Sequence, residues 1–192
     1  TNGKGDLYWG ILEVYSPKKC SVTISKYEHV QPPKISVHMV IAPTKNMDRF
    51  EWFLEKATEL GIHKITPILC ERSERKQLKL ERCNKIIASA LKQSLRVYAP
   101  ILEPLTPLND LNTVAPIICM AHCEEVEKIA LKKALTNQLK SCILIGPEGD
   151  FTPDEIAWAK ENNIIEVHLG DARLRTETAA LVALHTALLI NS

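Results

Sequence analysis

The stretch ILIGPEGDFTPDEIAWA, residues 143–159, decides the fold, because an apolar strand passes through a glycine-rich turn into a helix. Thr152 followed by Pro153 is typical of a helix start, with a capping side chain and a ring that fits the first turn. That start does not explain Gly146 and Gly149, which flank an acid within the turn. Glycines allow a backbone to approach a ligand closely, so we expect a binding site at this turn.

Apolar strands and amphipathic helices alternate on both sides of this turn. The expected strands are 34–42, 64–70, 115–121, 141–146 and 164–170, and the expected helices are 50–60, 80–94, 124–135, 153–163 and 176–190. This alternation predicts an α/β fold with a mostly parallel sheet flanked by helices on both faces. Ligands bind beyond the carboxyl ends of such strands, so three turns are candidate sites: MAHCEE (120–125), IGPEGDF (145–151) and HLGDARLRTETA (168–179).

The first 33 residues follow another pattern. LYWGILEVY (7–15) and CSVTISKY (20–27) are rich in aromatic and β-branched residues, and a turn separates them. QPPK (31–34) is a stiff connector. We therefore predict a small, incomplete β domain over residues 1–33 and an α/β domain over residues 34–192.

Composition places the chain among ordinary globular proteins, with 45% hydrophobic and 24% charged residues. It contains no apolar run long enough to span a bilayer and no signal-peptide pattern, so we expect a soluble, cytoplasmic protein that does not bind membranes. The 6 cysteines include no C-x-x-C pair. Cys119 and Cys123 flank His122, but a structural zinc site needs a second pair of ligands, so we expect no metal.

Charge is distributed unevenly along the chain. Residues 71–96 hold eight basic and three acidic residues, whereas residues 141–192 hold three basic and eight acidic residues. The basic stretch predicts an anionic partner, and a solvated helix without a partner explains it equally well. Arg173 and Arg175 are the only arginines after Arg96. They either pair with nearby acids (Glu148 or Glu177) or reach an anionic substrate, and the sequence leaves both open.

The last expected helix, residues 176–190, is apolar on nearly every side. Such a helix is buried all round, either in its own core or against another chain. Because a chain of this size seldom buries its last helix alone, we expect a dimer.

Three segments, IGPEGDF (145–151), HLG (168–170) and LRTETAAL (174–181), resemble in this order the SPOUT superfamily of methyltransferases. Within it, residues 50–73 and ALKQSLR (90–96) are similar to the bacterial 16S ribosomal RNA (uracil-N3)-methyltransferase family. The resemblance covers nearly the whole chain. It implies a C-terminal trefoil knot, a PUA-like β-barrel domain that binds RNA, and a homodimer formed through the knot and the last helix. The implied reaction transfers a methyl group from S-adenosylmethionine to N3 of a uridine that is exposed or flipped out of its stack.

The resemblance also implies roles for individual residues. Cofactor contacts are expected at Ala121, His122, Ile145, Gly146, Pro147, Glu148, Gly149, Leu169, Gly170, Leu174, Arg175, Thr176, Thr178 and Ala179. Contacts with 16S ribosomal RNA, free or in the small ribosomal subunit, are expected at Arg72, Arg75, Lys76, Gln93, Ser94 and Arg96. The family usually has Gly where Leu95 stands here.

The implied chemistry consists of positioning two reactants and removing a proton. We expect Arg96 or Arg175 to stabilise the uracil anion, and Glu148 or Glu177 to orient the substrate. No residue stands out as a general base. Three alternatives remain: a non-catalytic RNA-binding protein of the same fold, a SPOUT methyltransferase that acts on another RNA nucleotide, and a nucleotide-dependent enzyme that uses the acidic turn with a metal.

Overall fold

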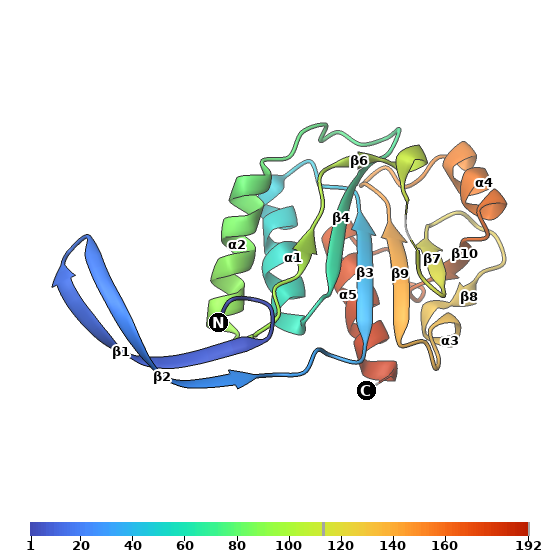
Figure 1. The fold of residues 1–192 in the computed structure, drawn as a ribbon. Coiled ribbons are helices and arrows are strands. Elements are labelled where there is room, and N and C mark those ends of the chain that lie inside the picture. The colour runs from blue at the N-terminus through green and yellow to red at the C-terminus, as the bar shows by residue number, and fades with distance from the viewer. Residues whose placement is uncertain (113, 192) are drawn as a thin grey trace.

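The computed structural model describes residues 1–112 and 114–191, with the side chain of Tyr15 excepted, and it shows a β-hairpin that reaches away from an α/β body (Figure 1). The hairpin pairs β1 (Asp6–Ser16) with β2 (Lys19–His29) in antiparallel register, which confirms the two predicted strands. Its large apolar side chains are exposed: Tyr8, Trp9, Ile11, Leu12, Val14, Val22, Ile24 and Tyr27. At the base of the hairpin, the Tyr98 hydroxyl donates to the Val30 carbonyl at 2.8 Å.

A parallel sheet forms the centre of the body. Its strands are β3 (Ser36–Ile41), β4 (Lys64–Leu69), β5 (Ile101–Leu102), β6 (Thr106–Pro107), β7 (Ile118–Ala121), β8 (Ile129–Ala130), β9 (Lys140–Ile145) and β10 (Ile165–His168). Their order is β5-β4-β3-β9-β7-β10-β8, with β6 beside β4, and each of these pairings is parallel. The predicted parallel sheet is therefore confirmed. Because β9, β7 and β10 are consecutive in this order, the three candidate turns meet at one edge.

Helices cover both faces of the sheet, as predicted. They are α1 (Met47–Leu60), α2 (Leu80–Gln93), α3 (Leu131–Ala134), α4 (Pro153–Glu161) and α5 (Thr176–Ile190), with a 3₁₀ turn η1 (Leu108–Asp110). One apolar core joins the sheet to α1, α2, α3 and α5, and a second core joins the other face to α4 and η1. No helix in the described part of the chain is long and apolar enough to cross a membrane.

The ends of two helices form as the sequence predicts. Gly61 ends α1 in a left-handed conformation, with φ of 93°, and its N–H donates to the carbonyls of Ala57 and Thr58. Thr152 caps α4 by accepting from the Glu155 N–H, and the Glu155 side chain accepts from the Thr152 N–H. These reciprocal bonds satisfy two otherwise unpaired backbone donors, so α4 begins at a fixed position beside the glycine turn.

Two expectations need correction. The helix predicted over residues 124–135 is wrong for most of its length, because only α3 is helical and β8 joins the sheet beside β10. The Lys128 ammonium donates to the carbonyls of His122 and Glu124 at 2.7 and 2.6 Å, which holds the chain in a turn instead of a helix. All-round burial of α5 also fails within one chain, since Val182 is 37% and Leu189 is 64% exposed. Burial against another chain remains a prediction.

Candidate active site

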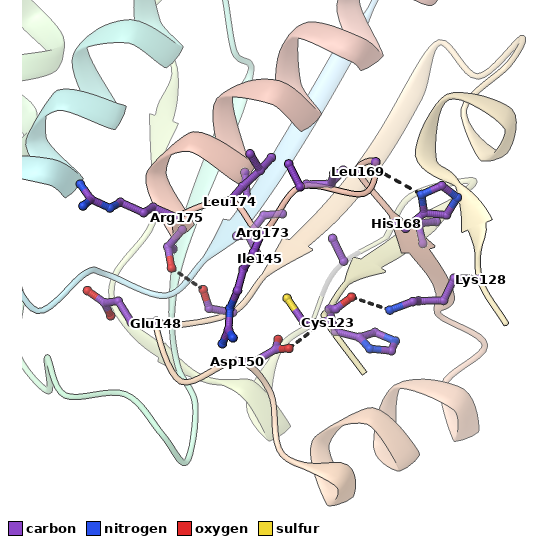
Figure 2. A pocket seen from close by; sticks show the side chains of 18 of the residues that line it. Cys123, Lys128, Ile145, Glu148, Asp150, His168, Leu169, Arg173, Leu174 and Arg175 are labelled. Carbon is purple, nitrogen blue, oxygen red and sulfur yellow. Dashed lines mark hydrogen bonds between the residues drawn. The ribbon is translucent and has the colours of Figure 1, made fainter. Parts of the chain in front are cut away.

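A cavity of about 620 Å³ lies at the carboxyl ends of β7, β9 and β10, where the three candidate turns meet (Figure 2). It is lined by Ala121, His122, Cys123, Lys128, Ile145, Gly146, Pro147, Glu148, Asp150, Val167, His168, Leu169, Gly170, Asp171, Ala172, Arg173, Leu174, Arg175, Thr176 and Ala179. Every residue predicted to contact a cofactor is among them except Gly149 and Thr178. Eight lining residues were not among the predicted cofactor contacts, although most lie within a selected turn and Arg173 was considered for an anionic substrate: Cys123, Lys128, Asp150, Val167, His168, Asp171, Ala172 and Arg173.

Hydrogen bonds between the turns hold the cavity together. The Thr176 hydroxyl, at the start of α5, donates to the Gly146 carbonyl at 3.2 Å, and both groups are buried. On the other side, the Cys123 N–H donates to a carboxylate oxygen of Asp150 at 2.7 Å. The turn after β9 is therefore bonded to the turn after β7 and to the segment after β10, so the cavity walls form one connected unit.

A side chain is disfavoured at each glycine of these turns for a different structural reason. Gly170 has φ of 112°, a conformation that side chains rarely adopt, and a Cβ there would meet no atom within 4 Å. A Cβ on Gly146 would lie 3.1 Å from the Phe151 ring. A Cβ on Gly149 would lie 3.2 Å from Arg72 Cβ, so Gly149 packs against Arg72 outside the cavity lining. Gly146 and Gly170 line the cavity, and of the two only Gly170 has open space where a Cβ would lie.

The cavity contains neutral and acidic acceptors in addition to the basic side chains of Lys128, Arg173 and Arg175. Burial lowers the pKa of His122, and its Nε2 lies 3.0 Å from a carboxylate oxygen of Glu166. When Nε2–H donates a hydrogen bond to that carboxylate, Nδ1 of the neutral ring carries no proton and can accept a hydrogen bond. Nδ1 is buried without a hydrogen-bond partner in the described structure. Glu148 accepts from the Lys45 N–H at 2.9 Å through Oε1 and still lines the cavity. Burial, followed by the charge of Asp150, raises the pKa of the Cys123 thiol.

The predicted catalytic residues lie in three places. Arg175 immediately precedes α5 and reaches toward α1 (Figure 2), and its guanidinium makes no hydrogen bond or ion pair within the described residues. Glu177 is buried in the first turn of α5, with Oε1 3.9 Å from Arg49 Nε. Arg96 donates to the carbonyls of Glu59 and Leu60, at the far end of α1 from the cavity. The structure therefore does not bring Arg96 together with the cavity.

The sequence left open whether the two late arginines pair with Glu148 or Glu177. Across residues 1–112 and 114–191, neither Arg173 nor Arg175 forms an ion pair with either acid. Figure 2 shows Arg173 among the cavity side chains, and its charge acts on Cys123. Both arginines are exposed, so their guanidinium groups are available to a ligand.

The residues predicted to bind RNA divide into two groups. Arg72 donates to the carbonyls of Gly149 and Phe151 at 2.9 and 3.3 Å, and Arg75 donates to the Lys45 carbonyl at 2.5 Å. These two arginines brace the rim of the cavity, and Lys76 is exposed nearby. The other group, Gln93, Ser94 and Arg96, lies at the opposite end of α2.

The possible zinc ligands Cys119, His122 and Cys123 do not lie together. Cys119 is buried in the core within β7, whereas Cys123 is exposed. Within the described residues, no group of three or more His, Cys, Asp or Glu side chains is arranged to hold a metal ion.

The sequence matches known proteins along most of its length. Residues 31–188 match the model of the RNA methyltransferase domain. A Rickettsia conorii protein named ribosomal RNA small subunit methyltransferase E is 29% identical, covering 91% of this chain and 73% of its own length. A Bacillus subtilis protein of the same name is 32% identical, covering 71% of this chain, and the match spans 59% of that relative.

Solved structures that are similar to this chain also include RNA methyltransferases. A Porphyromonas gingivalis protein described as a probable rRNA-methyltransferase has a TM-score of 0.91 and 35% identity, over 100% of this chain and 83% of its own. A Neisseria gonorrhoeae ribosomal RNA small subunit methyltransferase E bound to S-adenosyl methionine has a TM-score of 0.85 and 26% identity, over 98% and 80%. The SpoU methyltransferase AviRb of Streptomyces viridochromogenes, 14% identical over 83% of this chain and 61% of its own, has a TM-score of 0.52 and shares the fold alone. This chain therefore belongs to the family of RNA methyltransferase domains.

Proposed function

We propose that this chain transfers a methyl group from S-adenosylmethionine to N3 of a uridine in 16S ribosomal RNA. One observation carries the proposal. The turns that resemble the methyltransferase motifs in sequence are the turns that surround the cavity of about 620 Å³. The Neisseria gonorrhoeae relative, which shares this fold, was crystallised with the same methyl donor.

The lining fits that donor. S-adenosylmethionine supplies an activated methyl group on a positively charged sulfur. The lining holds the carboxylates of Glu148, Asp150 and Asp171, which suit the cationic sulfur, and the cations of Lys128, Arg173 and Arg175, which suit the carboxylate of the donor. Neutral His122 offers a buried acceptor at Nδ1. Gly170 has open space on the side where a Cβ would lie, so a nucleoside can lie against its backbone. The residues that would hold the donor are thus those of the three turns.

The chain's own residues then prepare the acceptor. Uracil N3 reacts as an anion, so a cation beside the ring lowers the cost of forming it. Arg175 lines the cavity and has no partner for its guanidinium among the described residues, which supports it for this role over Arg96. Glu148 is engaged with the Lys45 N–H and keeps the turn in place. Glu177 keeps one carboxylate oxygen without a hydrogen-bond partner among the described residues, so it is the acid we assign to the substrate.

RNA would approach over the rim of the cavity, where Arg72, Arg75 and Lys76 lie. The PUA-like nature of residues 1–33, the trefoil knot, the homodimer and the cytoplasmic location belong to the same proposal. The hairpin of β1 and β2 is consistent with part of a small β domain. The exposed apolar side chains of α5 are consistent with a second copy packed against them.

The proposal is tested by incubating the purified chain with methyl-labelled S-adenosylmethionine and either 16S ribosomal RNA or small ribosomal subunits, followed by digestion and mass spectrometry of the nucleosides. We expect label in 3-methyluridine at one position. Label in another nucleoside would favour a methyltransferase with a different target. Binding of RNA without binding of the donor would favour the non-catalytic alternative.

A further inference from the structure

We infer that a second cavity beside the first receives the target nucleobase, with Glu177 as the group that accepts its ring N–H. This inference rests on the proposed function. The second cavity measures about 420 Å³ and lies between the first turns of α1 and α5. Its lining consists of Asp48, Arg49, Trp52, Arg175, Glu177 and Thr178. Arg175 lines both cavities, so a base in the second lies next to a donor in the first.

Glu177 supplies the observation that points to a ligand. Only 6% of the residue is exposed, and its Oε2 has no hydrogen-bond partner in the described part of the chain. Its Oε1 has one distant cation, Arg49 Nε at 3.9 Å. A buried acceptor without a donor is unfavourable, so the site favours a ligand that supplies an N–H. Uracil carries one such donor at N3, between two carbonyl oxygens.

Trp52 and the two arginines complete the recognition of a nucleotide. The Trp52 side chain is 45% exposed although it borders a cavity, and an indole face of this kind stacks on a base. The Arg49 side chain is 39% exposed, and Figure 2 shows Arg175 extending toward α1, on the side of the second cavity. Two guanidinium groups suit the uracil carbonyl oxygens or the adjoining phosphate. The carboxylates of Asp48 and Glu177 disfavour a bare anion, so a base that carries both donors and acceptors fits better than free phosphate.

The position of Glu177 allows it to act as the proton acceptor of the reaction. Its carboxylate takes the proton of uracil N3–H, and the N–H bonding pair stays on N3. That pair forms the new bond to the methyl carbon, while the carbon–sulfur bond of the donor breaks and its electrons remain on sulfur. Glu177 afterwards releases the proton to water. Glu177 is thereby assigned the proton-accepting role that the sequence left without a candidate.

Fluorescence of Trp52 tests the inference without measuring activity. The chain has 3 tryptophans, so a Trp9→Phe/Trp158→Phe variant retains Trp52 as the only reporter. We titrate this variant with uridine 5′-monophosphate and with its 3-methyl derivative, which lacks the N–H. Uridine monophosphate should quench the emission saturably, and the methylated nucleotide should bind about tenfold more weakly because one charge-assisted hydrogen bond is lost. Adding Glu177→Gln should reduce this preference to about twofold, whereas adding Asp154→Asn, at an exposed acid of α4, should leave it unchanged.

Isothermal titration of each variant with S-adenosylmethionine separates the two hypotheses. If the donor binds and methyl transfer proceeds, but Trp52 emission does not respond or both nucleotides bind equally, the second cavity is not the base site and the proposed function survives. If the donor does not bind the wild-type chain, both proposals are overturned. Should Glu177→Gln fail to fold, Trp52→Ala decides: it must raise the KM for 16S ribosomal RNA at least fivefold without changing donor affinity, and an unchanged KM overturns the inference. Emission that depends on protein concentration instead of nucleotide would assign the cavity to a second copy and likewise overturn it.

Discussion

Leu95 has a left-handed backbone conformation just after α2, with φ of 56°. Its side chain is 86% exposed, so packing does not compensate for the strain. Gly is the residue that this conformation favours, because it has no Cβ to clash with the following carbonyl. We expect Leu95→Gly to raise the free energy of unfolding by about 1 kcal/mol, measured by urea denaturation. Leu95→Ala is the control and should give no comparable gain; a loss of stability in Leu95→Gly would contradict the account.

Arg72 is expected to stabilise the turn after β9 (residues 145–151) through its two hydrogen bonds to the carbonyls of Gly149 and Phe151. Arg72→Met keeps most of the side-chain volume against Gly149 but removes both donors. We expect about a 3- to 10-fold weaker affinity for S-adenosylmethionine, measured by isothermal titration, since the loss of such bonds costs on the order of 1 kcal/mol at an exposed site. Lys76→Met, which removes a nearby exposed charge, should leave this affinity unchanged. Equal effects of the two variants would show that Arg72 does not support the turn.

These residues show which features of the site could be predicted from the sequence. The sequence could predict the turn over residues 145–151 from its glycines and the helix start that follows, because backbone conformation and capping are local properties. The reasons for the individual glycines were not local. Gly149 meets Arg72, which is 77 positions away in the chain, and no pattern in the turn encodes that contact. For the same reason Glu177, far from Arg49 and Trp52 in sequence, could be selected as an acid but not placed in a second cavity.

At the scale of elements, strand β3 contains a titratable group that should control acid stability. Burial lowers the pKa of His38 to about 4, with the charge of Lys64 adding to the effect, and Nε2 lies 2.7 Å from the Thr66 hydroxyl. The unfolded chain binds a proton near pH 6.5, so protonation favours unfolding. The resulting stability is present above pH 6.5 and is lost as the pH falls toward 4, by at most about 3 kcal/mol because the side chain is partly exposed.

Thermal unfolding of wild type and His38→Asn between pH 7.5 and 4.5 measures this effect. The Tm of the wild type should fall more steeply below pH 6.5 than that of the variant, because asparagine does not titrate. Carboxylates elsewhere change the slope of both proteins equally, so the difference isolates His38. Parallel curves would contradict the assignment.

Most elements could be predicted because their patterns are regular. The strands β3, β4, β7, β9 and β10 and the helices α1, α2, α4 and α5 follow from apolar patterns, together with Gly61 and Thr152 at helix ends. The two-residue strands β5, β6 and β8 were not predicted. The error over residues 124–135 has a specific cause. Acids followed by lysines suit a helix, but Lys128 bonds to backbone carbonyls of its own turn, and Ile129 pairs with Val167 of β10. Tertiary pairing therefore overrode a local helix pattern.

At the scale of the whole molecule, exposed apolar residues on α5 favour association. Leu189 is 64% exposed and Val182 is 37% exposed, and they are separated by two helical turns on the outer side of α5. We expect light scattering to give twice the 21.5 kDa of one chain, and Leu189→Glu to give a monomer, since a charge is costly to bury in an apolar interface. Val126→Glu, at an exposed position outside α5, is the matched control and should stay dimeric. A monomeric wild-type chain would contradict the expectation.

The arrangement of the chain explains why the candidate active site lies at a single edge of the sheet. Strand order brings together three turns that are separated by up to about 50 residues, and the sequence predicted this meeting from the general rule for parallel sheets. The rule predicts the edge of the sheet where the site lies but not the path of the chain around it. The trefoil knot is therefore implied only by the resemblance and remains a prediction.

The account depends most on the claim that the cavity of the three turns holds the methyl donor. Isothermal titration of the chain with S-adenosylmethionine tests this claim directly, beside Ala121→Phe, which places a ring in the cavity, and Ala88→Phe, on the exposed side of α2. The account predicts one site per chain in the wild type and in Ala88→Phe, and an affinity at least tenfold weaker in Ala121→Phe when its thermal unfolding shows it to be folded. No binding to the wild type, or equal affinity in all three proteins, would contradict it.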